Sequence, residues 1–268
     1  MKHWAHNRLK ALTSAWVWAL LATVAWSQTL TWLGTLGGSP SWALGVSANG
    51  AVVVGFAFNA AGQLHAFRWT ASGGMQDLGT LGGNRSEAYG VSADGAVVVG
   101  YAVNAAWYER AFRWTASGGM RDLGTLGGRS SMANAVSADG RVVVGWADNS
   151  SGRRRAFRWT AAGGMRDLGT LPGGNESWAS DVSADGRVVV GRAYNGAGEW
   201  RAFRWTASGG MEDLNITYAS LLTNGSVLTI ASAISPNGRY IVGWGYNAAT
   251  GRYEAFLLDT GFPRRGGM

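Results

Sequence analysis

The sequence predicts an all-β protein, a single five-bladed β-propeller whose blades are four-stranded antiparallel sheets. Three observations lead to this prediction. Four short segments recur in a fixed order, each of them five times; glycine (42 of 268 residues) and aromatic residues (12%) are abundant; and the segments at the two ends of the chain are complementary. A repeat of about 45 residues with four strands is typical of a propeller blade.

The first two strands of each repeat are joined by the turn V-S-A-D-G or a close variant. Its glycines are Gly50, Gly95, Gly140, Gly186 and Gly238. A β-branched run such as Val97 to Val99 follows each turn and favours a strand. Asp-Gly between two such runs indicates a hairpin with glycine in the left-handed region. We interpret the aspartate as a turn residue, with a calcium site as the alternative.

The third strand is A-F-R-W-T or a variant, and the fourth lies around D-L-G-T-L after the turn A-S-G-G. A four-residue turn places Thr70 opposite Met75, and therefore Arg68 opposite Asp77. Opposite charges in this position contribute about 0.2 to 1 kcal/mol. The predicted structural ion pairs are Arg68 with Asp77, Arg113 with Asp122, Arg158 with Asp167, and Arg204 with Asp213. A catalytic or anion-binding ring of these residues is the alternative interpretation.

The ends of the chain predict a closed ring. Residues 30–36 form a segment of the fourth type, whereas the last repeat stops after its third segment at residue 260. The N-terminal strand would complete the last blade and leave no free sheet edge. Trp32 then takes the place of Asp77, and Leu257 that of Arg68, so these two residues are the predicted closure pair. The predicted propeller spans residues 28–260, with repeat units at 37–81, 82–126, 127–171, 172–217 and 218–260 plus 30–36, and a short tail at 261–268.

The repeat also resembles a known family. H-A-F-R-W-T at residues 65–70, followed by G-M at 74–75 and D-L-G-T-L-G-G at 77–83, resembles the bacterial extracellular repeat of the HAF family. The resemblance covers essentially all of the chain after residue 27. It implies an exported bacterial protein built of such repeats, and no particular reaction. The chain departs from the pattern at the histidine, which is replaced by Arg110, Arg155, Arg201 and Glu254 in the other repeats.

The N-terminus predicts export. Lys2, Arg8 and Lys10 precede an apolar run at residues 11–25 and the end A-W-S, which is typical of a signal peptide at residues 1–27. An uncleaved anchor is the alternative, but the run falls short of the ~20 residues that span a bilayer. We therefore expect a secreted or periplasmic protein with no membrane span after cleavage. With no cysteine in the chain, stability is expected to come from packing alone.

Charge argues against a nucleic-acid partner. The net charge of +7 includes the three basic residues of the leader, and the rest of the chain has 20 arginines against 16 acidic residues. The one dense basic run, residues 153–155, is short. We expect a monomer whose partners are carbohydrates or extracellular proteins.

The copies differ in the loops between strands two and three and in the connections between blades, which emerge on one face of a propeller. Loops on a rigid scaffold often carry recognition. Aromatic residues beside polar groups suit sugars or peptides. The predicted ligand-binding residues are Trp42, Trp107, Tyr108, Trp178, Trp200 and Tyr253, with Asn59, Asn104, Asn149, Asn195 and Asn247. Asparagine-capped turns are the alternative for the last five.

The sequence favours a non-catalytic binding module. His65 is the one histidine after residue 27, and no metal-ligand or nucleophile motif is present, so we expect no catalytic residue, cofactor or metal. The alternative is an extracellular glycoside hydrolase of the five-bladed propeller type, which needs two carboxylates. Its candidate acids are Glu87, Glu109, Asp148, Glu176, Asp181 and Glu199.

Overall fold

The structure is a computed structural model that describes residues 28–261. The predicted signal peptide at 1–27 and the tail residues 262–268 lie outside the described residues. Every strand belongs to one unit, Leu33–Met268.

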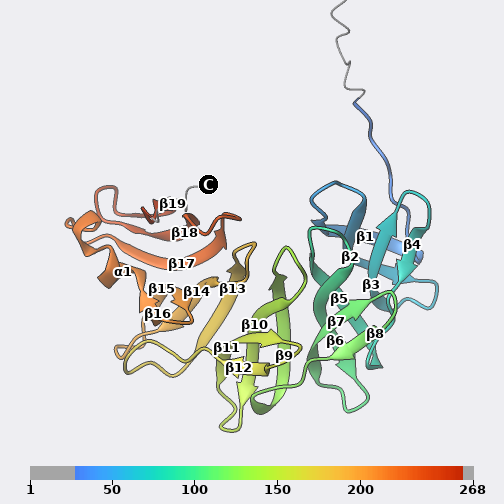
Figure 1. The fold of residues 1–268 in the computed structure, drawn as a ribbon, viewed down its shortest axis with the longest axis horizontal. Helices are drawn as coiled ribbons and strands as arrows, with labels where there is room; N and C mark the ends of the chain where they lie inside the picture. Colours follow the sequence, from blue (N-terminus) through green and yellow to red (C-terminus); the bar gives the residue numbers. More distant parts are fainter. Residues whose placement is uncertain (1–27, 262–268) are drawn as a thin grey trace, which may run out of the picture. The chain divides into compact units, whose positions relative to one another are not determined.

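Five antiparallel sheets follow one another along the chain (Figure 1). The first holds β1 (Gly37–Val46), β2 (Val52–Asn59), β3 (Leu64–Thr70) and β4 (Gly74–Asp77). The second holds β5 (Gly82–Val91), β6 (Val97–Asn104), β7 (Glu109–Thr115) and β8 (Gly119–Asp122). The third holds β9 (Gly127–Val136), β10 (Val142–Asn149), β11 (Arg154–Thr160) and β12 (Gly164–Asp167).

The fourth sheet holds β13 (Ser177–Val182), β14 (Val188–Tyr194), β15 (Trp200–Thr206) and β16 (Gly210–Asp213). The short helices α1 (Leu214–Thr217) and η1 (Ala219–Leu221) connect the fourth sheet to the fifth. The fifth sheet holds β17 (Val227–Ile234), β18 (Tyr240–Asn247) and β19 (Arg252–Asp259). These sheets confirm the predicted all-β class and the four-stranded antiparallel meander. Among residues 28–261, no helix is long and apolar enough to cross a membrane.

The hydrophobic core lies between consecutive sheets. Contacts join β1 to β5, β5 to β9, β9 to β13, and β13 to β17, so the first strands of the sheets form one row. In one core cluster, Val142 and Val144 of the third sheet pack with Ala179 and Phe203 of the fourth. The equivalent Phe112 packs with Val52 and Val54 of the first sheet. The phenylalanine of A-F-R-W-T therefore packs against a neighbouring sheet.

The repeated turns between first and second strands are linked to one another by backbone hydrogen bonds. Backbone hydrogen bonds run from Ala48 N to Ala93 O, from Ala93 N to Ala138 O, from Ala138 N to Ala184 O, and from Ala184 N to Pro236 O, at 3.0 to 3.1 Å. Within a turn, the Ser92 hydroxyl donates to Asp94 and accepts a bond from Val97 N. The aspartate accepts a further bond from Ala96 N, as expected of a turn residue. These turns form the uniform end of the repeat, where the copies hardly differ in sequence. Each turn contacts the next one, so the same residues are needed in every copy.

The predicted ion pairs are wrong by one residue of register. Thr70 pairs with Gly74, so Arg68 faces Gln76 and Asp77 faces Phe67. The same register holds in the next three sheets, so Arg113, Arg158 and Arg204 do not face Asp122, Asp167 and Asp213. The physical reason is a three-residue turn: Gly74 takes a left-handed φ of 65° and begins the fourth strand. A slip of one residue moves every side chain to the opposite face.

The arginines and aspartates of the repeat have other partners. The Arg68 Nε donates to Gly95 O in the next sheet's turn at 3.2 Å, and Arg113 and Arg158 reach Gly140 O and Gly186 O in the same way. The aspartates cap the following connection, as when Asp122 accepts a bond from Gly124 N. Asp77 also lies 2.8 Å from the Nδ1 of His65.

The predicted closure pair stays a prediction, because Trp32 belongs to the unit Met1–Trp32 and Leu257 to the unit Leu33–Met268. The fifth sheet has three strands among the described residues, and Trp32 and Leu257 are 88% and 69% exposed. Strand β1 begins at Gly37, and the segment before it has no strand pairing beyond a bridge from Leu36 to Asn59. Leu81 and Leu126 make the same bridge to Asn104 and Asn149, so residue 36 enters its sheet as the other connections do.

Candidate functional site

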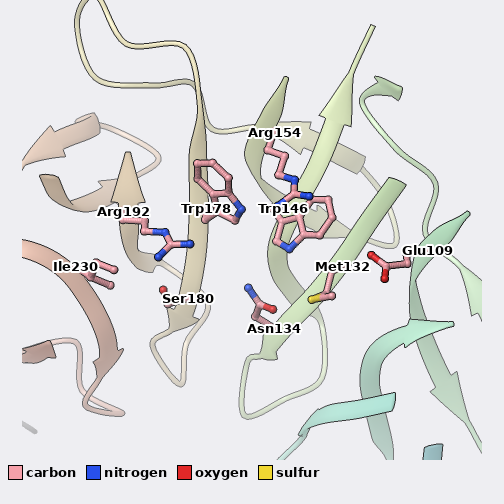
Figure 2. A pocket seen from close by; sticks show the side chains of 9 residues that line it. All are labelled: Glu109, Met132, Asn134, Trp146, Arg154, Trp178, Ser180, Arg192 and Ile230. Carbon is pink, nitrogen blue, oxygen red and sulfur yellow. The ribbon is translucent and has the colours of Figure 1, made fainter. Parts of the chain in front are cut away.

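A cavity of about 490 Å³ opens where four consecutive sheets contribute side chains (Figure 2). Its lining is Glu109, Met132, Asn134, Trp146, Arg154, Trp178, Ser180, Arg192 and Ile230. We call it the Trp-Arg cavity. Glu109 and Arg154 begin third strands, directly after the variable loops, so the cavity lies at the variable-loop end of these strands. Its volume falls within the range of small-molecule sites, roughly 300 to 1,000 Å³.

Tryptophans and arginines in mutual contact form one wall of this cavity. The Arg154 guanidinium carbon lies 4.4 Å from the ring centre of Trp146 and 6.0 Å from that of Trp178. The Arg192 guanidinium carbon lies 5.3 Å from Trp178 and 4.7 Å from Trp200. We call Trp146, Arg154, Trp178, Arg192 and Trp200 the Trp-Arg ladder. A cation over an indole face contributes about 0.5 to 2 kcal/mol, more when the pair is desolvated.

Strand geometry places the ladder. Trp146 and Arg192 each follow the glycine in the middle of a second strand, and Trp178 faces Arg192 across β13 and β14. A residue other than glycine could not replace Gly145 or Gly191, because an added Cβ would meet the first strand's backbone oxygen at 2.0 Å. The glycine therefore brings first and second strands close together beside the cavity.

The charge of the cavity is positive. Among residues 28–261, no ion pair or side-chain hydrogen bond involves Arg154 or Arg192. Burial lowers the pKa of Arg192 from its usual value. Glu109 is the one acidic residue of the lining, and Figure 2 shows it on the opposite side of the cavity from Arg192.

Two of the six predicted aromatic residues belong to this site: Trp178 lines the cavity and Trp200 ends the ladder. The others lie elsewhere. Trp42 packs on Phe56, and Tyr253 packs on Trp244 and Tyr246. Trp107 is 69% exposed in a turn with a left-handed φ of 64°, and the Arg129 guanidinium lies over Tyr108.

The five predicted asparagines cap their own turns. The Asn59 side-chain oxygen accepts bonds from Ala61 N and Gln63 N, and Asn104, Asn149 and Asn195 bond in the same pattern. Asn247 accepts a bond from Ala249 N. None of the five lines the Trp-Arg cavity within the described part of the chain. Their recurrence reflects turn chemistry, which was the alternative interpretation.

The candidate acids of the glycosidase interpretation are mostly engaged. Glu87 is buried and accepts hydrogen bonds from Arg85, Tyr89 and Tyr101. Asp181 accepts bonds from the backbone of Val182 and Ile234. Of the other four, Glu109 lines the Trp-Arg cavity, whereas Asp148, Glu176 and Glu199 do not. Within the described residues, no group of three or more metal-ligating side chains was found.

The sequence prediction placed binding in the loops and missed Met132, Trp146, Arg154 and Arg192. A signal for them exists inside the strands. The residue after the central glycine is Phe56, Tyr101, Trp146, Arg192 or Trp244, and its first-strand partner is Trp42, Glu87, Met132, Trp178 or Ile230. These strand positions vary although their neighbours repeat. Variation inside an otherwise repeated strand marks a surface that the fold does not need.

No protein-family model matches the sequence, and no curated protein matches it. Solved structures do resemble the fold. TolB from Acinetobacter baumannii is 15% identical with a TM-score of 0.56, over 82% of this chain and 52% of that one. The putative TolB from Agrobacterium tumefaciens is 16% identical with a TM-score of 0.51, over 82% and 73% of the two chains. A puromycin hydrolase mutant complexed with PGG is 16% identical with a TM-score of 0.50, over 78% and 34%.

This chain therefore spans about half the length of the first of these proteins and a third of the last. At such low identity the likeness concerns the fold alone, which is that of a β-propeller.

Proposed function

We propose that the chain is an exported β-propeller binding module that holds a carbohydrate or a peptide in the Trp-Arg cavity. The observation that carries this proposal is that the cavity is lined by strand positions that vary in an otherwise repeated structure. A residue retained for packing would be expected to repeat like its neighbours. Indole rings beside amide, hydroxyl and charged groups suit ligands that present both flat apolar faces and hydrogen-bonding groups.

The binding-competent form in this proposal is a closed ring of five blades. Its support is that both terminal faces carry apolar residues that are covered in the other sheets. Val242 of the fifth sheet is 41% exposed, whereas the equivalent Val144 is 0% exposed. Ala43 of the first sheet is exposed, whereas the equivalent Ala88 is fully buried. Packing these two faces on each other would bury both, and residues 29–32 would supply the fourth strand of the last blade.

Binding is a better-supported function than glycoside hydrolysis. A glycosidase of this kind uses two carboxylates about 5 to 10 Å apart, flanking the scissile bond. The Trp-Arg cavity has a single acid in its lining, Glu109. The same proposal includes export, which rests on the leader-like N-terminus, and membership of the HAF family, which rests on the repeated sequence motifs. It also includes a monomeric state.

A binding screen tests the proposal. The purified protein is applied to an array of glycans, bacterial cell-wall polymers and peptides, and released reducing sugar is assayed in the same wells. We expect retention of at least one ligand class without release of sugar, and loss of retention in Trp178→Ala. Retention that is unaffected in Trp178→Ala would place the site elsewhere, and release of reducing sugar would favour the hydrolase.

A further inference from the structure

The Trp-Arg ladder places two guanidinium groups over indole rings beside the cavity. The Arg154 guanidinium lies 4.4 Å from Trp146, and the Arg192 guanidinium lies against Trp178 and Trp200, whose ring centres are 4.7 Å from each other. Stacking occupies the flat faces of a guanidinium and leaves its N–H groups, which point outward in the plane, available for hydrogen bonds. Those donors have no side-chain or backbone acceptor among residues 28–261. The ladder therefore presents positively charged donors that no protein group of the described residues occupies.

Two cations line this cavity, and neither has a carboxylate partner among the described residues. Arg192 is partly withdrawn from water, and the Arg154 charge faces it across the shared indole of Trp178. Other arginines of this protein have a carboxylate partner. Arg201, for example, forms an ion pair with Glu199 at 2.6 Å. A bound anion would supply the missing charge and accept bonds from both guanidinium edges.

We propose that the Trp-Arg cavity binds an acidic carbohydrate, and that Arg154 and Arg192 hold its carboxylate. The planar fork of arginine matches a carboxylate in two parallel hydrogen bonds. The other polar lining groups, the amide of Asn134, the hydroxyl of Ser180 and the carboxylate of Glu109, provide partners for sugar hydroxyls. Met132 and Ile230 provide the apolar part of the wall, which suits the C–H face of a sugar ring.

This inference rests on the proposed binding function and specifies its ligand. The probe is trigalacturonic acid, measured by calorimetric titration of the purified protein, with the uncharged trisaccharide galactotriose, inorganic phosphate and a tripeptide with a free carboxyl terminus as comparisons. We expect trigalacturonic acid to bind at least tenfold more tightly than each comparison. Its affinity should fall with added salt, because the attraction between partly exposed charges is screened.

Arginine variants locate the carboxylate. Arg192→Gln and Arg154→Gln should each weaken binding about tenfold or more, because a charge-assisted hydrogen bond is lost. Arg192→Lys keeps the charge and loses the fork, so it should restore binding only in part. Arg187→Gln is the matched control, since Arg187 lies at a turn of the uniform end and pairs with Asp185. Circular dichroism melting of each variant separates loss of binding from loss of folding.

The outcomes are distinguishable. If galactotriose binds as tightly as trigalacturonic acid and the arginine variants bind normally, the module binds sugars but the acidic inference is overturned. If phosphate or the tripeptide competes with equal affinity, the site is not specific for an acidic sugar and the inference is also overturned. If no member of the wider screen binds, the proposed function fails together with the inference.

Discussion

At the scale of single residues, the pairing of the third and fourth strands allows one sheet position to be compared across four repeats. The residue opposite the repeated arginine is Gln76, Arg121, Arg166 or Glu212. Arg204 forms an ion pair with Glu212 at 3.0 Å, whereas Arg113 faces a like charge. Burial and the neighbouring Arg121 together lower the pKa of Arg113. The same sheet position is therefore favourable in one blade and unfavourable in two others.

We predict that Arg121→Glu stabilises the protein, because it replaces a like-charge pair by the pairing found between Arg204 and Glu212. A directly opposed pair contributes roughly 0.2 to 1 kcal/mol, and like charges cost a similar amount. The free energy of unfolding should therefore rise by about 0.5 to 1.5 kcal/mol, measured by denaturant titration at low salt. Arg121→Gln, which copies the first sheet, should fall between wild type and Arg121→Glu. A glutamine variant as stable as the glutamate one would refute the pairing.

Asp181 predicts a second, pH-dependent effect. Burial raises the pKa of Asp181 above its ordinary value, although bonds from Ile234 N and Val182 N act in the opposite direction. A raised pKa in the folded state means that the folded protein holds this proton more tightly than the unfolded chain. The contribution of Asp181 to stability should therefore increase as the pH falls from neutrality through the raised pKa towards about 4, the ordinary value of an aspartate.

The measurement compares wild type with Asp181→Asn, which has no proton to bind at this position. Denaturant unfolding at a series of pH values from 7 to 4 gives the difference in free energy of unfolding. This difference should shift in favour of wild type as the pH is lowered. Two parallel pH profiles would mean that Asp181 has the same pKa in the folded and unfolded protein.

At the scale of strands and sheets, repetition made most of the architecture predictable. Five copies of each strand and turn were compared with one another, so the antiparallel order of strands within the four-stranded sheets followed from the sequence. Register did not follow, because it depends on whether Gly74 belongs to the turn or to the strand, and glycine is suited to both. The same ambiguity explains why the charge pairs were misassigned.

The binding site was harder to predict than the strands. Its side chains come from four sheets, so their proximity depends on how consecutive sheets pack. Trp178 and Trp200 were predicted because aromatic residues in variable loops are typical of binding sites. Arg154 and Arg192 were not, because their importance lies in being stacked and unpaired, which no local pattern records.

A buried serine ties each of the second, third and fourth sheets to the one before it. The Ser131 hydroxyl accepts a bond from Ala111 N at 2.9 Å and donates to Gly124 O at 2.6 Å. Ser131→Ala would leave a buried N–H and a carbonyl without this partner, so we predict a loss of about 1 to 3 kcal/mol in the free energy of unfolding. Ser130→Ala is the adjacent control, because only the backbone of Ser130 bonds to Asp148, and it should cost less than about 0.5 kcal/mol. Equal effects on denaturant unfolding would argue against the proposed tie.

At the scale of the whole molecule, the proposed seam between the first and last sheets would differ from the contacts between consecutive sheets. The hydrogen bonds that link consecutive turns end at Pro236, whose nitrogen has no hydrogen to donate to another turn. A closed ring would therefore lack this bond at the seam. Closure would depend on burial of the two terminal faces and on pairing of residues 29–32 with β19.

The observed register identifies which residues would then face each other. Phe67 pairs with Asp77 and Arg68 with Gln76, so by equivalence Phe256 would face Trp32, and Leu257 would face Thr31. Leu257 is 69% exposed without such a partner, which is unusual for a leucine in a strand. The pair to test is therefore Leu257 with Thr31, one residue away from the pair that the sequence alone indicated.

Paired cysteines provide the test, because the chain has no cysteine of its own. We predict that Thr31→Cys with Leu257→Cys forms an intramolecular disulfide under mild oxidation, since opposed cross-strand residues bring their Cβ atoms within about 4.5 to 5.5 Å. The product should migrate differently on a non-reducing gel and unfold at higher denaturant concentration, because a cross-link restricts the unfolded chain. Trp32→Cys with Leu257→Cys is the control, one residue out of register and on the opposite face of the strand, and it should cross-link far more slowly. Equal rates for the two pairs would mean that a mobile N-terminal segment collides with β19 without pairing. Disulfides formed only between chains would mean that the strand completing the last blade comes from a second copy.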